Sequence, residues 1–202
     1  MKTVFRIDVP DQRKQLIIRV GGQMGIEKYC GYVLFDDSDY ADYPNPKWRK
    51  RALHLDVRRG VEEISPEHIV QLISSPDCDH FVWLSKRIVE SELVHMVWVY
   101  AHELRHVIQD TLYPELSEMT GHLRKRLQDR YAIEMPQEYD AELAARDIVV
   151  QFFGEEEYQA YRCREAARDS RATEYHRKFD ELASNWTGDL IAETRRIILS
   201  LE

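Results

Sequence analysis

The segment His102-Glu103-Leu104-Arg105-His106 constrains the fold most, because its side chains act together only on a helix. On an α-helix, residues four apart lie on one face about one turn apart, so both imidazoles point toward the same place. Apart from His95, residues 93–101 are all apolar, and Val107 and Ile108 follow the segment. Such flanks are typical of a helix that is packed on several sides within a domain. The sequence therefore predicts a buried helix that presents two imidazoles.

The pattern H-E-x-x-H also indicates a chemistry. Two imidazoles one turn apart bind Zn²⁺, and a glutamate beside them takes a proton from a metal-activated water. We therefore expect His102 and His106 to be zinc ligands and Glu103 to be the general base. Two histidines and one carboxylate suit zinc best among the common divalent metals.

A third protein ligand is expected, because catalytic zinc usually has three and leaves a fourth position open. The extended motif H-E-x-x-H-x-x-G-x-x-H is excluded, since Gln109 and Leu112 stand where it needs glycine and histidine. The later segment 136–147 offers carboxylates instead. It begins with Pro136, which suits a first helical turn, and it is rich in alanine.

Within this second helix, Glu138 is the expected third ligand, and Asp140 and Glu142 are its rivals. His122 is a weaker rival, because three basic residues follow it closely. Glu142 lies one turn after Glu138 and is expected to accept a hydrogen bond from a ligand imidazole, which would fix its tautomer. Small residues at 141, 144 and 145 would let this helix approach the first one closely.

These residues resemble those of the gluzincin peptidases, which combine H-E-x-x-H with a downstream glutamate ligand. The matching residues are His102, Glu103, His106 and Glu138. The glutamate helix of many gluzincins reads E-x-x-A-[DN], and here Ala141 is kept and Glu142 stands where Asp or Asn is usual. In its compact size and motif order the chain is also similar to the ImmA/IrrE family. The resemblance covers about residues 93–150. It implies a zincin-like fold and a zinc metallopeptidase that acts on peptide or protein substrates.

Two alternatives remain open beside the peptidase. The first is a catalytically inactive zincin-fold protein with a binding or structural role, since Arg105 stands where zinc peptidases usually carry an uncharged residue. The second is a helical interaction module with no metal. The donor that a tetrahedral oxyanion needs besides zinc is also open. Tyr139, Tyr131 and His122 are the candidates.

Length, charge and composition limit the classes of protein to which the chain can belong. The chain has 202 residues, 44% of them hydrophobic, which suffices for one sizeable core. The net charge of −8 argues against non-specific nucleic-acid binding. No apolar run is long enough for a membrane span, and charges near Met1 argue against a signal peptide. Three widely spaced cysteines, Cys30, Cys78 and Cys163, are expected to be reduced thiols in a cytoplasmic protein.

The hydrophobic pattern predicts an α+β fold with a mostly antiparallel N-terminal sheet followed by helices. We expect one zincin-like domain over 1–202, with a sheet-rich part (1–84), the metal-site helices (85–154) and a C-terminal helical extension (155–202). The apolar face of the last helix is expected to pack on the domain, and a homodimer through the C-terminal helices is the alternative. The expected strands are 3–9, 15–20, 31–35, 52–57 and 80–84. The expected helices are 65–75, one around the histidine motif, 115–130, 136–153, 155–169, 171–184 and 188–201.

Overall fold

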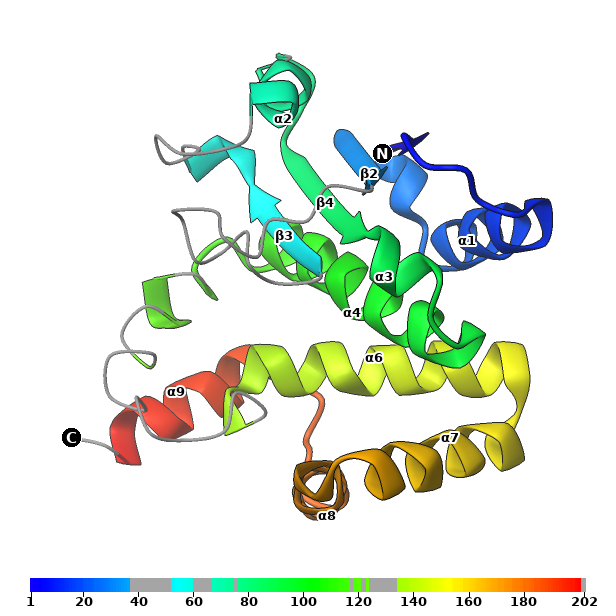
Figure 1. Ribbon diagram of the computed structural model, residues 1–202. Coiled ribbons are helices and arrows are strands. Elements are labelled where there is room, and N and C mark those ends of the chain that lie inside the picture. The colour runs from blue at the N-terminus through cyan, green and yellow to red at the C-terminus, as the bar shows by residue number, and fades with distance from the viewer. Residues whose placement is uncertain are drawn as a thin grey trace. The chain divides into compact units, whose positions relative to one another are not determined.

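Figure 1 shows the computed structural model of the chain, which describes residues 1–36, 52–59, 67–74, 76–116, 118–120, 123 and 134–200. The described residues form an α+β protein with a four-stranded sheet in the N-terminal part and helices beyond it. The chain divides into two units, Met1–Val107 and Ile108–Glu202. The division falls inside one continuous helix, α4 (Leu93–Leu112).

A mixed sheet forms the centre of the first unit. Its strands are β1 (Lys2–Phe5), β2 (Gly31–Asp36), β3 (Ala52–Asp56) and β4 (His80–Ser85), in the order β1-β2-β4-β3. β1, β2 and β4 are parallel, and only β3 is antiparallel to its neighbour β4. The prediction of a mostly antiparallel sheet is therefore wrong. Parallel neighbours need a long crossover, and the helix between β1 and β2 supplies one.

That crossover helix, α1 (Asp11–Gln23), replaces the strand predicted over 15–20. The strand prediction was wrong because residues 15–20 contain β-branched side chains, whereas Ile17, Val20 and Gly21, the buried residues of α1, have the spacing of a helix. Pro10 directly precedes this helix, and its carbonyl accepts from the amides of Arg13 and Lys14.

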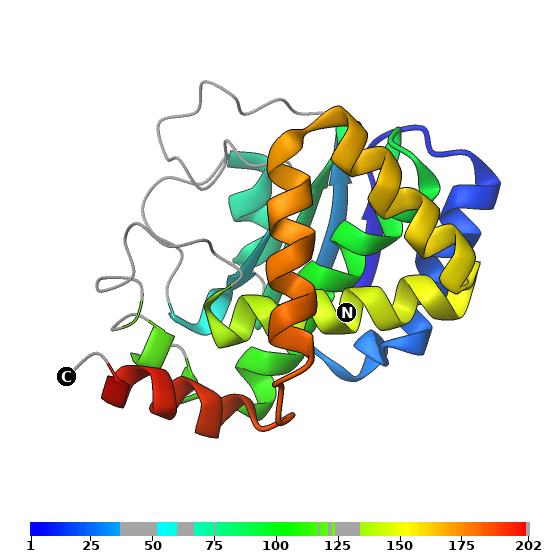
Figure 2. The ribbon, with the colours of Figure 1, turned by 90° about the horizontal axis from the view of Figure 1, so that it is seen from below.

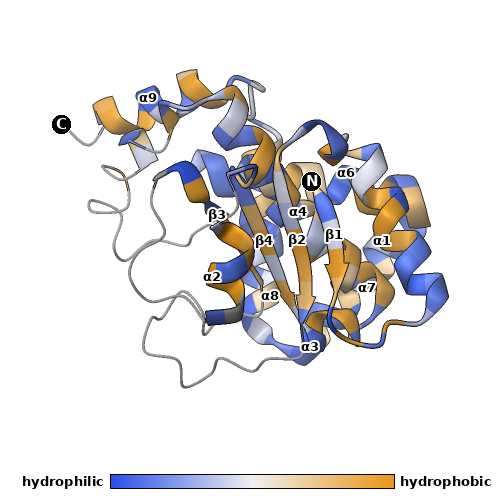
Figure 3. Cartoon of the chain, turned by 90° about the horizontal axis from the view of Figure 1, so that it is seen from above, coloured by the Kyte–Doolittle hydropathy of each residue, from blue (hydrophilic) through white to orange (hydrophobic). Residues whose placement is uncertain are grey.

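Helices cover both faces of the sheet. Because side chains alternate along a strand, β2 sends Leu34 to one face and Phe35 to the other. Leu34 packs with Ile69 of the helix α2 (Glu67–Ile73), and the ring of Phe35 lies 5.7 Å from that of Tyr100 on α4. α2 and α4 therefore lie on opposite faces, and Figure 3 shows the two central strands, β2 and β4, as largely hydrophobic.

Short helices complete the first unit. The helix α3 (Lys86–Val89) joins β4 to α4, and single turns occupy η1 (Ile26–Lys28) and η3 (Val57–Arg59). Gly21 lies in the last part of α1 at a close approach. A Cβ there would stand 2.8 Å from the Cδ1 of Ile26 and 3.1 Å from the hydroxyl oxygen of Tyr100. Only glycine fits this position without a shift of its neighbours.

Among the described residues of the second unit, four helices match the predicted ranges closely: α6 (Pro136–Phe153), α7 (Glu155–Arg168), α8 (Ser170–Ala183) and α9 (Leu190–Ser200). Pro136 occupies the first turn of α6, as predicted. Figure 2 shows α8 running across α6. Most of the helix predicted over 115–130 lies outside the described residues, as does the polar segment 37–51.

Two clusters hold this second unit together. Tyr139 of α6 packs with Phe179 of α8 and with Trp186. Ile197 and Ile198 of α9 pack against Leu123 and Met135. Part of the apolar face of α9 is thus covered within the unit. The homodimer through the C-terminal helices stays a prediction.

The three cysteines are free thiols, as expected. Burial raises the pKa of the Cys78 thiol to about 11, so this side chain stays neutral in the core. No helix in the described part of the chain is both long enough and apolar enough to cross a membrane.

Candidate metal centre

His102 and His106 lie one turn apart on α4, and their imidazoles converge. The two Nε2 atoms are 3.1 Å apart, and the ring planes are inclined at 84°. Two nitrogens bound to one zinc ion at about 2.05 Å in tetrahedral geometry are about 3.4 Å apart. The observed separation is close to that value. The pair therefore fits one shared divalent metal ion.

The helix that carries this pair is largely buried. Val97, Ala101, Leu104 and Val107 have no exposed surface. The motif residues Glu103 and His106 are half-buried, and they lie on a different part of the helix surface from these apolar residues. A packed helix is a rigid element, and rigid elements hold metal ligands in one geometry.

One turn beyond His106, Gln109 fixes the end of α4 to the beginning of α6. Its side-chain amide donates to the Gln137 carbonyl at 2.8 Å and to Oδ2 of Asp140 at 2.7 Å. Gln109 is 2% exposed and Asp140 is 8% exposed, so the hydrogen bond between them is buried, whereas the bond to the Gln137 carbonyl is partly buried. Asp140, a rival for the ligand position, is thus engaged by Gln109. Sequence reasoning used Gln109 only to exclude a motif and missed this role.

Glu138 follows Gln137 in the first turn of α6 and is half-buried. Its Oε1 accepts a hydrogen bond from the Gln137 side chain at 3.2 Å, and Gln137 in turn accepts from Thr120 at 2.6 Å. One ligand atom from each of His102, His106 and Glu138 lies within 4.8 Å of the other two. Two imidazole nitrogens and one carboxylate oxygen are the donor set of a catalytic zinc site.

Glu142, one turn further along α6, has a neighbour that the sequence did not suggest. Tyr175 of α8 lies near its carboxylate. Burial, and then the negative charges of Glu142 and Glu138, raise the pKa of Tyr175. Tyr175 therefore stays neutral. The expected hydrogen bond from a ligand imidazole to Glu142 stays a prediction.

Of the three oxyanion candidates, only Tyr139 lies among the described residues. It is 2% exposed in the core of the second unit, and burial raises its pKa to about 12. Its ring contacts the rings of Phe179 and Trp186, so Tyr139 has a packing role in this core. Tyr131 and His122 lie outside the described residues.

Two further histidines of the first unit extend the pair on α4: His54 lies beside His106, and His80 lies beside His54. His54 of β3 is half-buried, and its ring centre lies 6.3 Å from that of His106 with the planes inclined at 22°. Nε2 of His54 is 3.3 Å from Nδ1 of His80 on β4, and His80 is 2% exposed. The signal for this pairing in the sequence is weak, because each histidine stands alone in its strand.

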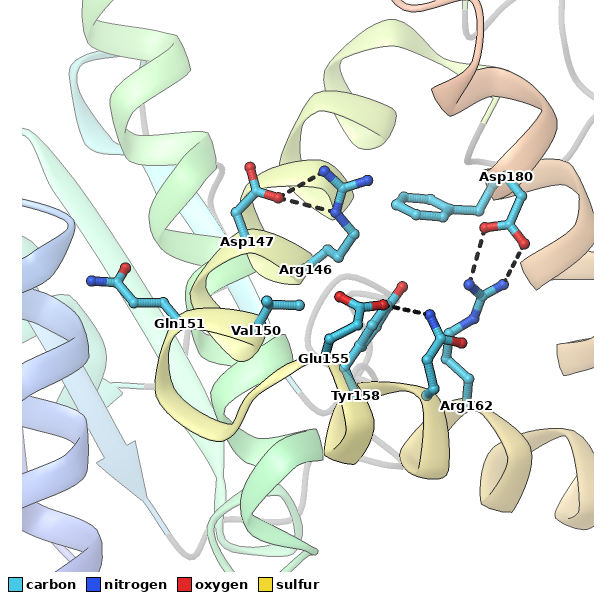
Figure 4. A pocket seen from close by; sticks show the side chains of 10 residues that line it. Arg146, Asp147, Val150, Gln151, Glu155, Tyr158, Arg162 and Asp180 are labelled. Atoms are coloured by element: carbon cyan, nitrogen blue, oxygen red, sulfur yellow. Dashed lines mark hydrogen bonds and ion pairs between the residues drawn. The ribbon is translucent and has the colours of Figure 1, made fainter.

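A separate cavity of about 480 Å³ lies in the second unit (Figure 4). Its two arginines are paired: Arg146 with Asp147 at 2.7 Å and Arg162 with Asp180 at 2.8 Å. The lining mixes both charges and includes none of the predicted site residues. It consists of Arg146, Asp147, Val150, Gln151, Glu155, Tyr158, Gln159, Arg162, Phe179 and Asp180.

Comparisons with known proteins do not assign the chain to a family. No family model matches the chain, no curated protein matches it, and no solved structure matches it.

Proposed function

We propose that the chain is a zinc-dependent metallopeptidase of the gluzincin type, with His102, His106 and Glu138 as metal ligands. The observation that carries the proposal is the convergence of the His102 and His106 Nε2 atoms to 3.1 Å on a buried helix. The closeness of a Glu138 oxygen to both nitrogens supports it. The similarity of the motif to that of the gluzincins and the ImmA/IrrE family supports the class.

Zinc in such a site would lower the pKa of a water molecule and polarise the scissile carbonyl. Glu103 adjoins the first ligand on α4 and takes the proton of the attacking water, then passes it to the leaving amine. Gln109 holds the end of α4 and the first turns of α6 together through one buried and one partly buried hydrogen bond. This contact keeps the carboxylate of Glu138 on a fixed element.

The edge of the sheet supports a proposal for the substrate class. Within the described sheet, β3 is an edge strand, and His54 places one of its faces beside His106. An extended peptide is suited to such an edge, because main-chain hydrogen bonds continue the sheet. We therefore assign peptide or protein substrates in extended conformation.

Metal content and hydrolysis test the proposal together. Elemental analysis of the purified protein is expected to give about one zinc per chain, and His106→Ala is expected to lose it. Glu103→Gln is expected to keep the metal and to lose cleavage of a mixed peptide pool followed by mass spectrometry. No metal in the wild type after zinc is offered would overturn the proposal. Bound metal without cleavage of any peptide would favour the inactive zincin-fold alternative.

A further inference from the structure

We propose that His54 is a further catalytic residue of this hydrolysis, whose imidazole donates a hydrogen bond to the substrate oxyanion. The inference rests on the proposed function. A tetrahedral oxyanion in acyl transfer gains much of its stabilisation from fixed hydrogen-bond donors, and one donor accounts for about 10²–10³ in kcat. The sequence suggested tyrosines or His122 for this role, whereas the structure brings His54 beside His106.

Strand register places His54 on the α4 side of the sheet. His54 pairs with Val82 across the β3–β4 ladder, whereas its neighbours Leu53 and Leu55 pack in the cluster beneath α2. Alternation along the strand therefore turns the imidazole away from that cluster. It lies beside His106, the second ligand of the proposed site.

The separation of the two rings suits a donor to the oxyanion. A zinc ion lies about 2 Å from a ligand nitrogen, an oxygen about 2 Å from zinc, and a donor nitrogen about 3 Å from that oxygen. A donor can thus stand up to about 7 Å from the ligand nitrogen. The ring centres of His54 and His106, from which the nitrogens are displaced by about one bond length, are 6.3 Å apart, a separation comparable with that reach.

His80 gives His54 a fixed orientation. Nδ1 of His80 lies 3.3 Å from Nε2 of His54, and His80 is buried on the central strand β4. When the His80 Nδ1–H donates to His54 Nε2, a neutral His54 carries its own proton on Nδ1. In that tautomer the Nδ1–H of His54 is the donor that the oxyanion would meet. His80 is therefore a positioning residue for His54.

The test uses cobalt(II) in place of zinc and inorganic phosphate as a tetrahedral oxyanion. Visible absorption of the cobalt-loaded protein reports metal affinity, and its change on addition of phosphate reports anion affinity. The variants are His54→Phe, which removes the donors, and His54→Gln, which restores one. Leu55→Val on the opposite face of the same strand controls for disturbance of β3.

We expect all variants to bind cobalt within about 2-fold of the wild type, and His54→Phe to weaken phosphate binding by about 10-fold. His54→Gln should recover part of that loss, and Leu55→Val should match the wild type. Unchanged phosphate affinity in His54→Phe with cobalt still bound would overturn the inference and leave the proposed function standing. Failure of the wild type to bind cobalt would overturn both.

Discussion

Gln109 and Asp140 share a buried hydrogen bond of 2.7 Å between the last turns of α4 and the first turns of α6. The same amide also donates to the Gln137 carbonyl, so one side chain satisfies two acceptors. A buried acceptor that loses its donor costs the free energy of its desolvation. The arrangement makes Gln109 important for stability as well as for the proposed site.

Gln109→Ala is expected to lower the free energy of unfolding by about 1–3 kcal/mol, because the buried carboxylate of Asp140 loses a donor. Urea unfolding followed by circular dichroism measures this change. Gln159 is the matched control, since it is exposed and, among the described residues, bonds only to Glu155 in its own helix. Gln159→Ala should stay within about 0.5 kcal/mol of the wild type. Equal effects of the two variants would contradict the role of Gln109.

Gly21 and Gly22 should respond oppositely to alanine. In Gly22→Ala the new methyl group meets nothing within 4 Å, so helix propensity is expected to stabilise the protein by about 0.5–1 kcal/mol. In Gly21→Ala the methyl group would meet Ile26 at 2.8 Å, and the variant should be less stable than Gly22→Ala by about 1–3 kcal/mol. Thermal melts of both variants check the ranking, which would be refuted by a Gly21→Ala protein as stable as Gly22→Ala.

Zinc is expected to stabilise the folded chain through linkage, since the unfolded chain lacks the assembled ligands. At free zinc 100-fold above Kd, the gain in the free energy of unfolding is about 2.7 kcal/mol. Urea midpoints with zinc and with a chelator measure the gain. His106→Ala should show little or no difference between the two conditions. A gain of the same size in His106→Ala would place the metal elsewhere.

Alkaline pH should destabilise the second unit. Burial raises the pKa of Tyr139 and of Tyr158 to about 12, against about 10 when unfolded. Both therefore favour the folded state below pH 10, and that contribution is lost as pH rises from 10 to 12. Replacing Tyr158 by Phe should reduce the loss by up to about 1.4 kcal/mol per pH unit in this window. Urea midpoints at pH 9, 10 and 11 test this, and parallel curves for variant and wild type would refute it.

Local patterns were sufficient for the helices of the second unit. Pro136 begins α6 and Gly154 ends it, and the periodic apolar residues between them are typical of a helix. α1 was missed because Gln15–Val20 contains both β-branched residues and a helical spacing. Packing of Gly21 near Tyr100, which is distant in the sequence, favours the helix, and no local pattern contains that contact.

The candidate site divides in the same way. His102, Glu103 and His106 could be predicted as site candidates, because their spacing within one helix is visible in a short stretch of sequence. His54 and His80 were not found, because strand order and register bring them together across 26 residues. Neither property is encoded in a short window of sequence. The parallel pairing of β1, β2 and β4 was missed for the same reason.

The alternation along β3 has an evolutionary consequence. Leu53 and His54 are neighbours in sequence, yet one contributes to the core and the other to the proposed chemistry. Single substitutions can change either contribution while leaving the other intact. Loss of one residue near the start of β3 would instead exchange the two faces, burying an imidazole under α2 and turning a leucine toward His106. This strand should therefore diverge in related chains by replacement and hardly at all by insertion or deletion.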